Sequence, residues 1–243
     1  MQHSTNYVLL YTMGMTVIVA VVLAGMFSSL KDIHKENERN YNKKQLLSSL
    51  NNYGKFAEEG IKLDKLPDTE VATIFDKVKT AVIDHEGNAV EGVNAVDVDM
   101  EKEEKKPLAD RQYPVYIYDG AGGEKIYILS VRGNGLWDKI WGWIAVKNDE
   151  NRSVVGAAFG HKGETPGLGA EISDNNSWKK KFSEDKQLYK GGQYTSVLVK
   201  KGGAKDLDVQ VDGISGATVT CDGVSVMLDK GLKIYMPYLD AQK

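Results

Sequence analysis

The sequence predicts an α+β protein with a mostly antiparallel sheet, flanking helices and one preceding N-terminal transmembrane helix. Three features predict it: an uncharged apolar run near the start, a central series of short β-rich segments, and helical apolar spacing near the end. The 243 residues suffice for one membrane anchor and one globular domain of about 200 residues. We therefore expect an anchor at residues 1–30 and one folded domain at residues 31–243, without internal repeats.

The apolar run from Tyr7 to Phe27 contains no charged residue. At ~1.5 Å rise per residue it spans about 30 Å as a helix, which matches the hydrocarbon core of a bilayer. Tyr7 and Tyr11 suit the membrane interface. A cleaved signal peptide is the alternative, but no Lys or Arg precedes the run and the run is long. These features favour an uncleaved anchor.

Basic residues follow the anchor, and none precedes it. They are Lys31, Lys35, Arg39, Lys43 and Lys44. The positive-inside rule, applied alone, would leave the large domain in the cytoplasm.

The composition argues against two classes of function. The net charge of −3 gives no basic face for nucleic acid, so no nucleic-acid partner is expected. Cys221 is the only cysteine, and none of the four histidines is paired at helical spacing. No metal site is therefore predicted.

The first part of the domain predicts two helices and a charged insertion. Leu46, Leu47 and Leu50 have helical spacing within an expected helix over residues 42–61. A shorter helix is expected at residues 70–79. The charge-rich stretch 84–111 is interpreted as a solvated loop or insertion.

From Tyr113 onward the residue pattern is typical of strands joined by turns. Strands are expected at residues 113–118, 125–132, 141–147, 153–160 and 194–200. Apolar residues from Val224 to Tyr235 share one face of a final helix, which Pro237 ends.

Two glycine-rich loops, residues 161–169 and 212–220, are the candidate sites. Neither has the Gly-Lys-Ser/Thr end of a phosphate-binding P-loop. In the second loop, Gly216 and Ala217 leave room for a bulky planar group, and a helix starting near Asp222 would favour a phosphate. The alternative is a Ser or Thr N-cap after a glycine turn with no ligand, and local features alone favour it.

Three motifs then carry a family resemblance. Asp212-Gly-Ile-Ser-Gly-Ala-Thr218 resembles the flavinylation motif of the FMN-binding domain family. His161-Lys-Gly-Glu-Thr-Pro-Gly-Leu-Gly169 and Gly133-Asn-Gly-Leu-Trp137 resemble two further signatures of that family, in the same order. The resemblance implies a covalent FMN, joined by a phosphoester to the Thr218 hydroxyl. It also implies a partner flavin transferase that uses FAD as donor.

Two sequence segments indicate which branch of the family the chain resembles. Gly135-Leu-Trp-Asp-Lys-Ile-Trp-Gly-Trp143 and Tyr235-Met-Pro-Tyr-Leu239 are more similar to the C subunits of sodium-translocating NADH:quinone reductases than to the G subunits of ferredoxin:NAD oxidoreductases. This implies an electron-carrier protein, relaying electrons between NADH-side centres and quinone beside the other membrane subunits of a reductase complex. It also implies a single-pass protein of the inner (cytoplasmic) membrane.

Two points stay open. The resemblance places the flavin domain on the periplasmic or outer side, against the lysine count. A G subunit of the ferredoxin:NAD complex and a non-redox, membrane-tethered binding domain are the alternative functions.

The resemblance also assigns residue roles, none of them catalytic. Glu164, Thr165, Gly167 and Leu168 would line the flavin, and Leu136 and Trp137 would cover its apolar face. Asp212 belongs either to the transferase recognition sequence or to a turn. The other expected neighbours of the cofactor are Ser215, Gly216, Ala217 and Val219.

Overall fold

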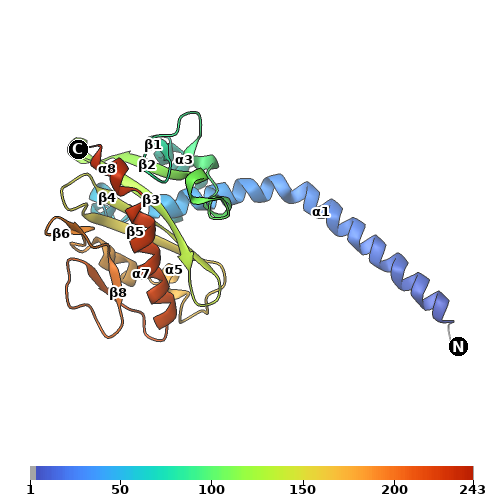
Figure 1. Cartoon of the computed structure of the whole chain (residues 1–243). Coiled ribbons are helices and arrows are strands. Elements are labelled where there is room, and N and C mark those ends of the chain that lie inside the picture. Colours follow the sequence, from blue (N-terminus) through green and yellow to red (C-terminus); the bar gives the residue numbers. More distant parts are fainter. Residues whose placement is uncertain (1–3, 243) are drawn as a thin grey trace. The chain divides into compact units, whose positions relative to one another are not determined.

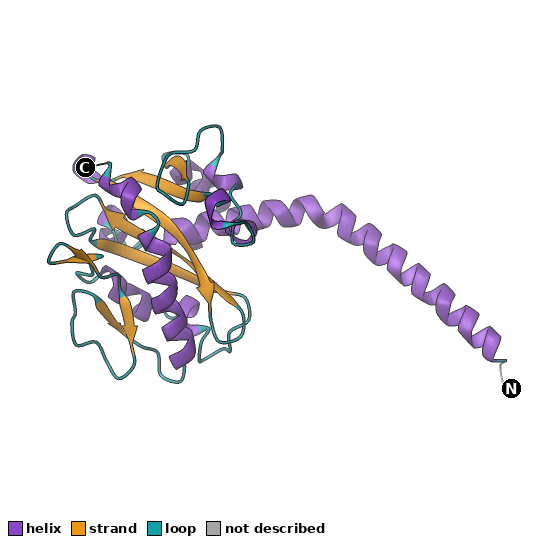
Figure 2. Ribbon diagram, in the orientation of Figure 1, coloured by secondary structure: helices purple, strands orange, loops and turns teal. Residues whose placement is uncertain are grey.

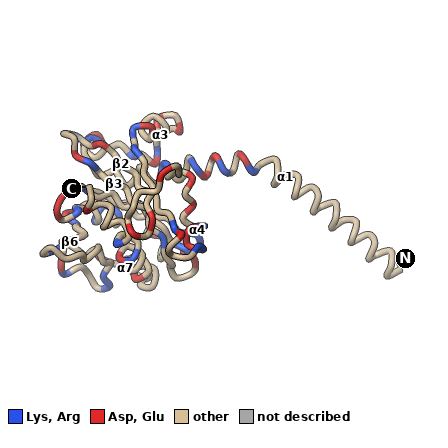
Figure 3. Tube along the Cα trace, turned by 45° about the horizontal axis from the view of Figure 1, so that its top comes forward, with Lys and Arg blue, Asp and Glu red and all other residues tan. Residues whose placement is uncertain are grey.

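The computed structural model describes residues 4–242, which form two compact units divided after Asn42. The first unit is a single helix, the larger part of α1 (Thr5–Ser48). Its first half carries no charge (Figure 3), and it is long and apolar enough to cross a membrane. The expected anchor is therefore present as a helix, apart from residues 1–3, which lie outside the described residues.

The second unit is built on a five-stranded sheet with strand order β1-β2-β3-β4-β5. Every neighbouring pair is antiparallel, as predicted (Figures 1 and 2). The strands are β1 (Lys79–Ile83), β2 (Tyr113–Asp119), β3 (Lys125–Asn134), β4 (Lys139–Lys147) and β5 (Val154–His161).

Side chains alternate between two buried faces of this sheet. On β3, Leu129 and Val131 belong to one core cluster, whereas Ile126 and Ile128 belong to the other. Helices therefore cover both faces, and the domain has two hydrophobic layers.

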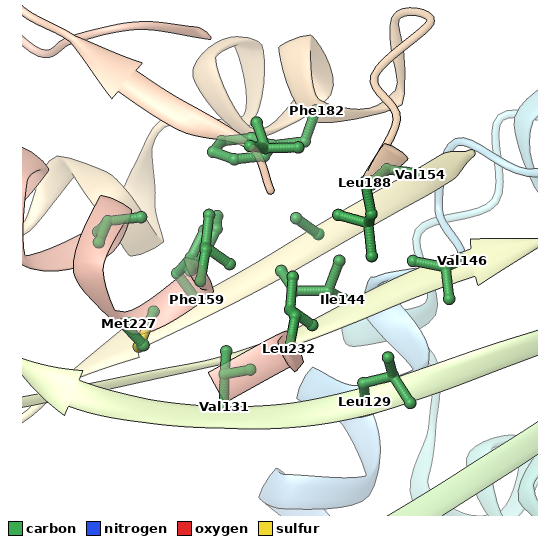
Figure 4. Close-up of a cluster of buried hydrophobic side chains, with 14 of the residues drawn as sticks. Leu129, Val131, Ile144, Val146, Val154, Phe159, Phe182, Leu188, Met227 and Leu232 are labelled. Carbon is green, nitrogen blue, oxygen red and sulfur yellow. The ribbon is translucent and has the colours of Figure 1, made fainter. Parts of the chain in front are cut away.

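The first face is covered by the C-terminal part of the chain. Met227 and Leu232 of α7 (Thr218–Lys233) pack with Val131 and Phe159 of the sheet (Figure 4). The same face also receives α5 (Glu171–Asp174), α6 (Asn176–Lys180), η5 (Lys181–Ser183) and α8 (Met236–Asp240).

The second face is covered by the beginning of the second unit. Leu46 and Leu47 at the end of α1, Phe56 of α2 (Gly54–Glu58) and Phe75 of α3 (Asp68–Phe75) pack there. The two predicted helices have different bounds. Residues 42–61 are divided by turns at 49–53, and residues 76–79 leave the helix to begin β1.

The stretch 84–111 is exposed to solvent over most of its length, but it is not an irregular loop throughout. It contains η2 (Ala95–Asp97), α4 (Met100–Glu103) and η3 (Leu108–Asp110). Ala95 and Glu103 are buried, and the Tyr116 hydroxyl donates to the Ala95 carbonyl at 3.1 Å. These contacts anchor an otherwise largely exposed segment to the domain.

Four short strands complete the domain. They are β6 (Tyr189–Lys190), β7 (Gln193–Tyr194), β8 (Leu198–Lys200) and β9 (Gln210–Asp212). The predicted strand at 194–200 is interrupted at Ser196, whose φ is 57°. The pair β8 and β9 is parallel and delivers the chain to residue 213, directly before the second glycine-rich loop.

Candidate functional site

The site begins at the N-terminus of α7, which starts at Thr218, before the expected start near Asp222. Ala217 occupies the N-cap position, and no side chain caps the helix. Thr220 N–H and the two N–H groups before it have no hydrogen-bond acceptor among residues 4–242. The expected alternative of a Ser or Thr N-cap is therefore not found, and the first N–H groups of the helix lack a side-chain acceptor.

A tight turn presents Thr218. The Ala217 N–H donates to the Ile214 carbonyl at 3.2 Å, and Gly216 has a φ of 79°. A side chain is strained in that conformation, and a Cβ on Gly216 would lie 2.6 Å from Leu168 Cδ2. Glycine at this position therefore brings the loops of the second and first motifs into contact.

Cys221 lies beneath this turn. Its side chain is buried, and its Sγ accepts a hydrogen bond from the Ile214 N–H at 3.3 Å. Burial raises the pKa of the thiol above its ordinary value. Cys221 is therefore a small buried residue of α7, and a protonated thiol in this position gives no reason to assign it redox chemistry.

Glu164 is the link between all three motifs. Its carboxylate accepts the Thr220 hydroxyl at 2.6 Å and the Trp137 backbone N–H at 3.0 Å. Only 4% of the residue is exposed. A Cβ on either Gly135 or Gly169 would overlap the carboxylate oxygens. These two glycines therefore make room for a buried acid, which points into the protein and does not line its surface.

Apolar side chains surround the open helix end at the surface. Leu136, Trp137, Leu168 and Val219 are all exposed, Trp137 at 69%. The Trp137 indole N–H donates to Thr165 Oγ1 at 3.2 Å, which ties the first loop to the third motif. Large apolar side chains in such a group are typical of a surface that a ligand or partner covers.

Asp212 is held by structural contacts on three sides. Its carboxylate accepts the Lys181 ammonium and the Ala204 N–H, each at 2.7 Å. Its carbonyl accepts the Trp178 indole N–H at 2.7 Å. The Lys181 ammonium holds the pKa of Asp212 below its ordinary value. These contacts fix the end of β9. They support a structural role for Asp212 at this turn, the second of the two roles expected from the sequence.

The structure thus brings the predicted residues of the three motifs to one region. Sequence reasoning gave no pairing for Thr220 with Glu164, nor for Asp212 with Lys181 and Ala204. The partners lie 56, 31 and 8 positions apart in the sequence. Local spacing carries no signal for such contacts. Within the described residues, no group of His, Cys, Asp or Glu could hold a metal ion.

Comparisons with known proteins decide the family. The FMN-binding domain family matches residues 135–233. The C subunit of the Na(+)-translocating NADH-quinone reductase of Pseudomonas aeruginosa is 31% identical over 93% of this chain and 91% of its own length. The chain belongs to the family of these C subunits.

Solved structures of the family share the fold. The C subunit from Parabacteroides distasonis is 34% identical, covers 88% of this chain and 98% of its own, and has a TM-score of 0.74. NqrC from Shewanella oneidensis is 25% identical, covers 85% and 99%, and has a TM-score of 0.68. The predicted resemblance to the C-subunit family is therefore confirmed, and the G subunits of ferredoxin:NAD oxidoreductases are not the family that these relatives support.

The match to the FMN-binding domain family coincides with the site. It begins at Gly135, beside the exposed Leu136 and Trp137, and extends to the end of α7 at Lys233. It therefore encloses the buried Glu164 link and the open helix end at Thr218. Homologous C subunits belong to an oxidoreductase complex, so this chain is one subunit of such an enzyme.

Proposed function

We propose that this protein carries FMN in a phosphoester bond to Thr218 and relays electrons between other centres of its reductase complex. The proposal covers residues 31–243 as the FMN-binding domain and residues 1–30 as its anchor. Membership of the C-subunit family supports the cofactor and the complex. The attachment residue and the relay role rest on the arguments that follow.

The observation that carries the proposal is the open N-terminus of α7. Three backbone N–H groups at residues 218–220 have no protein acceptor within the described chain, and the helix dipole places partial positive charge there. The Thr218 hydroxyl has no hydrogen-bond partner among the described residues, whereas the Thr220 hydroxyl is engaged by Glu164. A phosphate esterified to Thr218 would therefore lie beside free donors.

The surroundings fit the rest of the cofactor. Leu136, Trp137, Leu168 and Val219 are exposed around the helix end and suit the apolar faces of an isoalloxazine ring. The hydroxyl of Thr165 fixes the Trp137 indole from one side. Bound FMN supplies one- and two-electron redox chemistry, while these residues position the ring and limit its contact with water.

Attachment needs a second protein. An unactivated threonine hydroxyl is a weak nucleophile, and Glu164 is occupied by Thr220 and Trp137. A flavin transferase would activate Thr218 so that its oxygen attacks the FMN phosphorus of FAD. The pyrophosphate bond breaks, AMP leaves, and the threonine proton is lost. The exposed Ser215 and Gly216 leave this turn accessible to such an enzyme.

The test is flavin retention after denaturation. The full chain is produced with and without a flavin transferase and precipitated in acid. The fluorescence of the washed precipitate is then measured. We expect fluorescence only from the transferase sample, and its loss in Thr218→Ala with an unchanged circular dichroism spectrum. Retention of flavin by that variant would contradict the assignment of Thr218.

A further inference from the structure

The β3–β4 hairpin carries Leu136 and Trp137 at its tip. Asn134 of β3 and Lys139 of β4 form the last paired residues, and the Gly135 N–H closes the turn on the Asp138 carbonyl at 2.8 Å. Trp137 is bonded to Glu164 and Thr165 at the tip, and the base of the hairpin is a second place where its position can be fixed.

Glu104 joins the two strands at that base. Its Oε2 lies 3.1 Å from Arg132 Nε on β3 and 3.2 Å from Lys139 Nζ on β4. The Arg132 guanidinium also contacts Glu101 at 3.2 Å and lies 5.6 Å from the centre of the Trp141 ring. Only 12% of the Arg132 side chain is exposed, so its ion pairs are shielded more than ordinary surface pairs are.

The segment that presents Glu104 is itself ordered. Asp99 caps α4 by accepting the Glu101 N–H at 3.0 Å. The buried Glu103 accepts the Gln112 N–H at 3.0 Å, and Arg111 donates to the Glu104 carbonyl at 2.8 Å. The backbone on both sides of Glu104 is therefore fixed to the start of β2. Figure 3 shows the dense charges of this region around α4.

We propose that residues 99–112 form a hairpin clamp, in which Glu104 is a positioning residue for the β3–β4 tip. The clamp holds Arg132 and Lys139 together and so limits the movement of Trp137. Its consequence for FMN, a fixed indole against the ring, rests on the proposed function. The clamp itself does not, because it is a property of the protein without cofactor.

The test is hydrogen exchange of the full, cofactor-free chain in detergent, comparing wild type with Glu104→Gln. The probes are the Gly135 and Trp137 amides, which are hydrogen-bonded in the structure. Loss of two partly shielded ion pairs should speed their exchange about fivefold. High salt should move wild type only part of the way toward the variant, because the pairs are partly shielded, and should change the variant less. Glu91→Gln, an exposed acid of the same stretch, is the control and should behave as wild type.

Lys139→Gln tests the same contact from the other strand and should reproduce the faster exchange at the tip. Unchanged exchange in both variants would overturn the clamp, as would an equal acceleration throughout the domain. With flavin attached, Glu104→Gln should also alter the visible absorption and circular dichroism of the FMN. Faster exchange with an unaltered flavin spectrum would refute only the proposed effect of the clamp on FMN. Absence of flavin from wild type would instead refute the proposed function.

Discussion

At the scale of single residues, the acidic side chains of the site motifs are hydrogen-bonded to other groups of the protein. Glu164 and Asp212 stand in motifs that suggest ligand contact, yet their carboxylates bind protein groups. The residues left for a cofactor are the Thr218 hydroxyl, the open N–H groups beside it, and exposed apolar side chains. Buried residues therefore shape the loops, and in the proposed function the surface residues contact the cofactor.

Glu164→Ala should be strongly destabilising. It leaves the Thr220 hydroxyl and the Trp137 N–H without an acceptor, and a lost buried partner costs roughly 1–3 kcal/mol for each group. Glu164→Gln keeps the shape and one acceptor, so its loss should be smaller. The measurement is thermal unfolding of the cofactor-free chain, with exposed Glu91→Ala as control. Equal melting temperatures for wild type and Glu164→Ala would contradict the role of this acid as a link.

Asp212 makes a prediction about pH. Its pKa in the folded protein is lowered, chiefly by the Lys181 ammonium. The stabilisation is therefore present above the unfolded pKa of about 3.9 and is lost as pH falls through the folded pKa. Asp212→Asn should lower the free energy of unfolding at neutral pH, and this difference should shrink on acidification. Urea titrations of both proteins at several pH values measure it. A difference that is constant with pH would exclude the ion pair as its source.

At the scale of elements, α7 positions the site because it packs closely on the sheet. A Cβ on Gly223 would overlap the Asn134 carbonyl oxygen and lie 3.5 Å from Gly135 Cα. The helix therefore approaches the third motif at its backbone. This contact aligns the open helix end with the Trp137 hairpin.

Gly223→Ala should consequently destabilise the domain, although alanine is the better helix former by ~1 kcal/mol. The backbone has no space for a methyl group, and overpacking typically costs about 1–3 kcal/mol. Chemical denaturation measures the loss, with Asp222→Ala at the preceding exposed position as control. A more stable Gly223→Ala protein would show that the contact is not tight.

The elements also show where sequence reasoning succeeds. Strands β2 to β5 and the apolar face of α7 were predictable because period-2 and helical patterns record burial directly. Strand β1 was missed because Lys79 and Thr80 are exposed at its start and no alternation precedes them. The anchoring contacts of the insertion could not be predicted, because a charge run looks the same whether its partners are water or Arg132 and Lys139.

At the scale of the whole molecule, motifs in the sequence predicted candidate site residues, and only the fold explains why these residues lie close together. Gly135, Glu164 and Thr220 are far apart in the chain and meet because β3 and β5 end, and α7 begins, in the same region. The apolar part of α1 was predictable from composition alone. The side of the membrane on which the domain lies was not, because the basic residues after the anchor oppose the family expectation.

Orientation is therefore a prediction for intact cells. Glu91 is exposed, and the single native Cys221 is buried, so Glu91→Cys adds one accessible thiol. We expect a membrane-impermeant maleimide to label it without lysis, since we place the domain on the outer side. Wild type is the control for background labelling of Cys221. Labelling that appears only after lysis would place the domain in the cytoplasm, as the lysine count suggests.

The central claim is that Thr218, and neither neighbouring hydroxyl, carries the cofactor. Tandem mass spectrometry of the peptide containing Ser215 to Met227, from chain produced with the transferase, tests it most directly. We predict a mass increase equal to FMN less one water, with fragment ions that place it on Thr218. Modification of Ser215 or Thr220, or an unmodified peptide from protein that nevertheless holds FMN, would contradict the account.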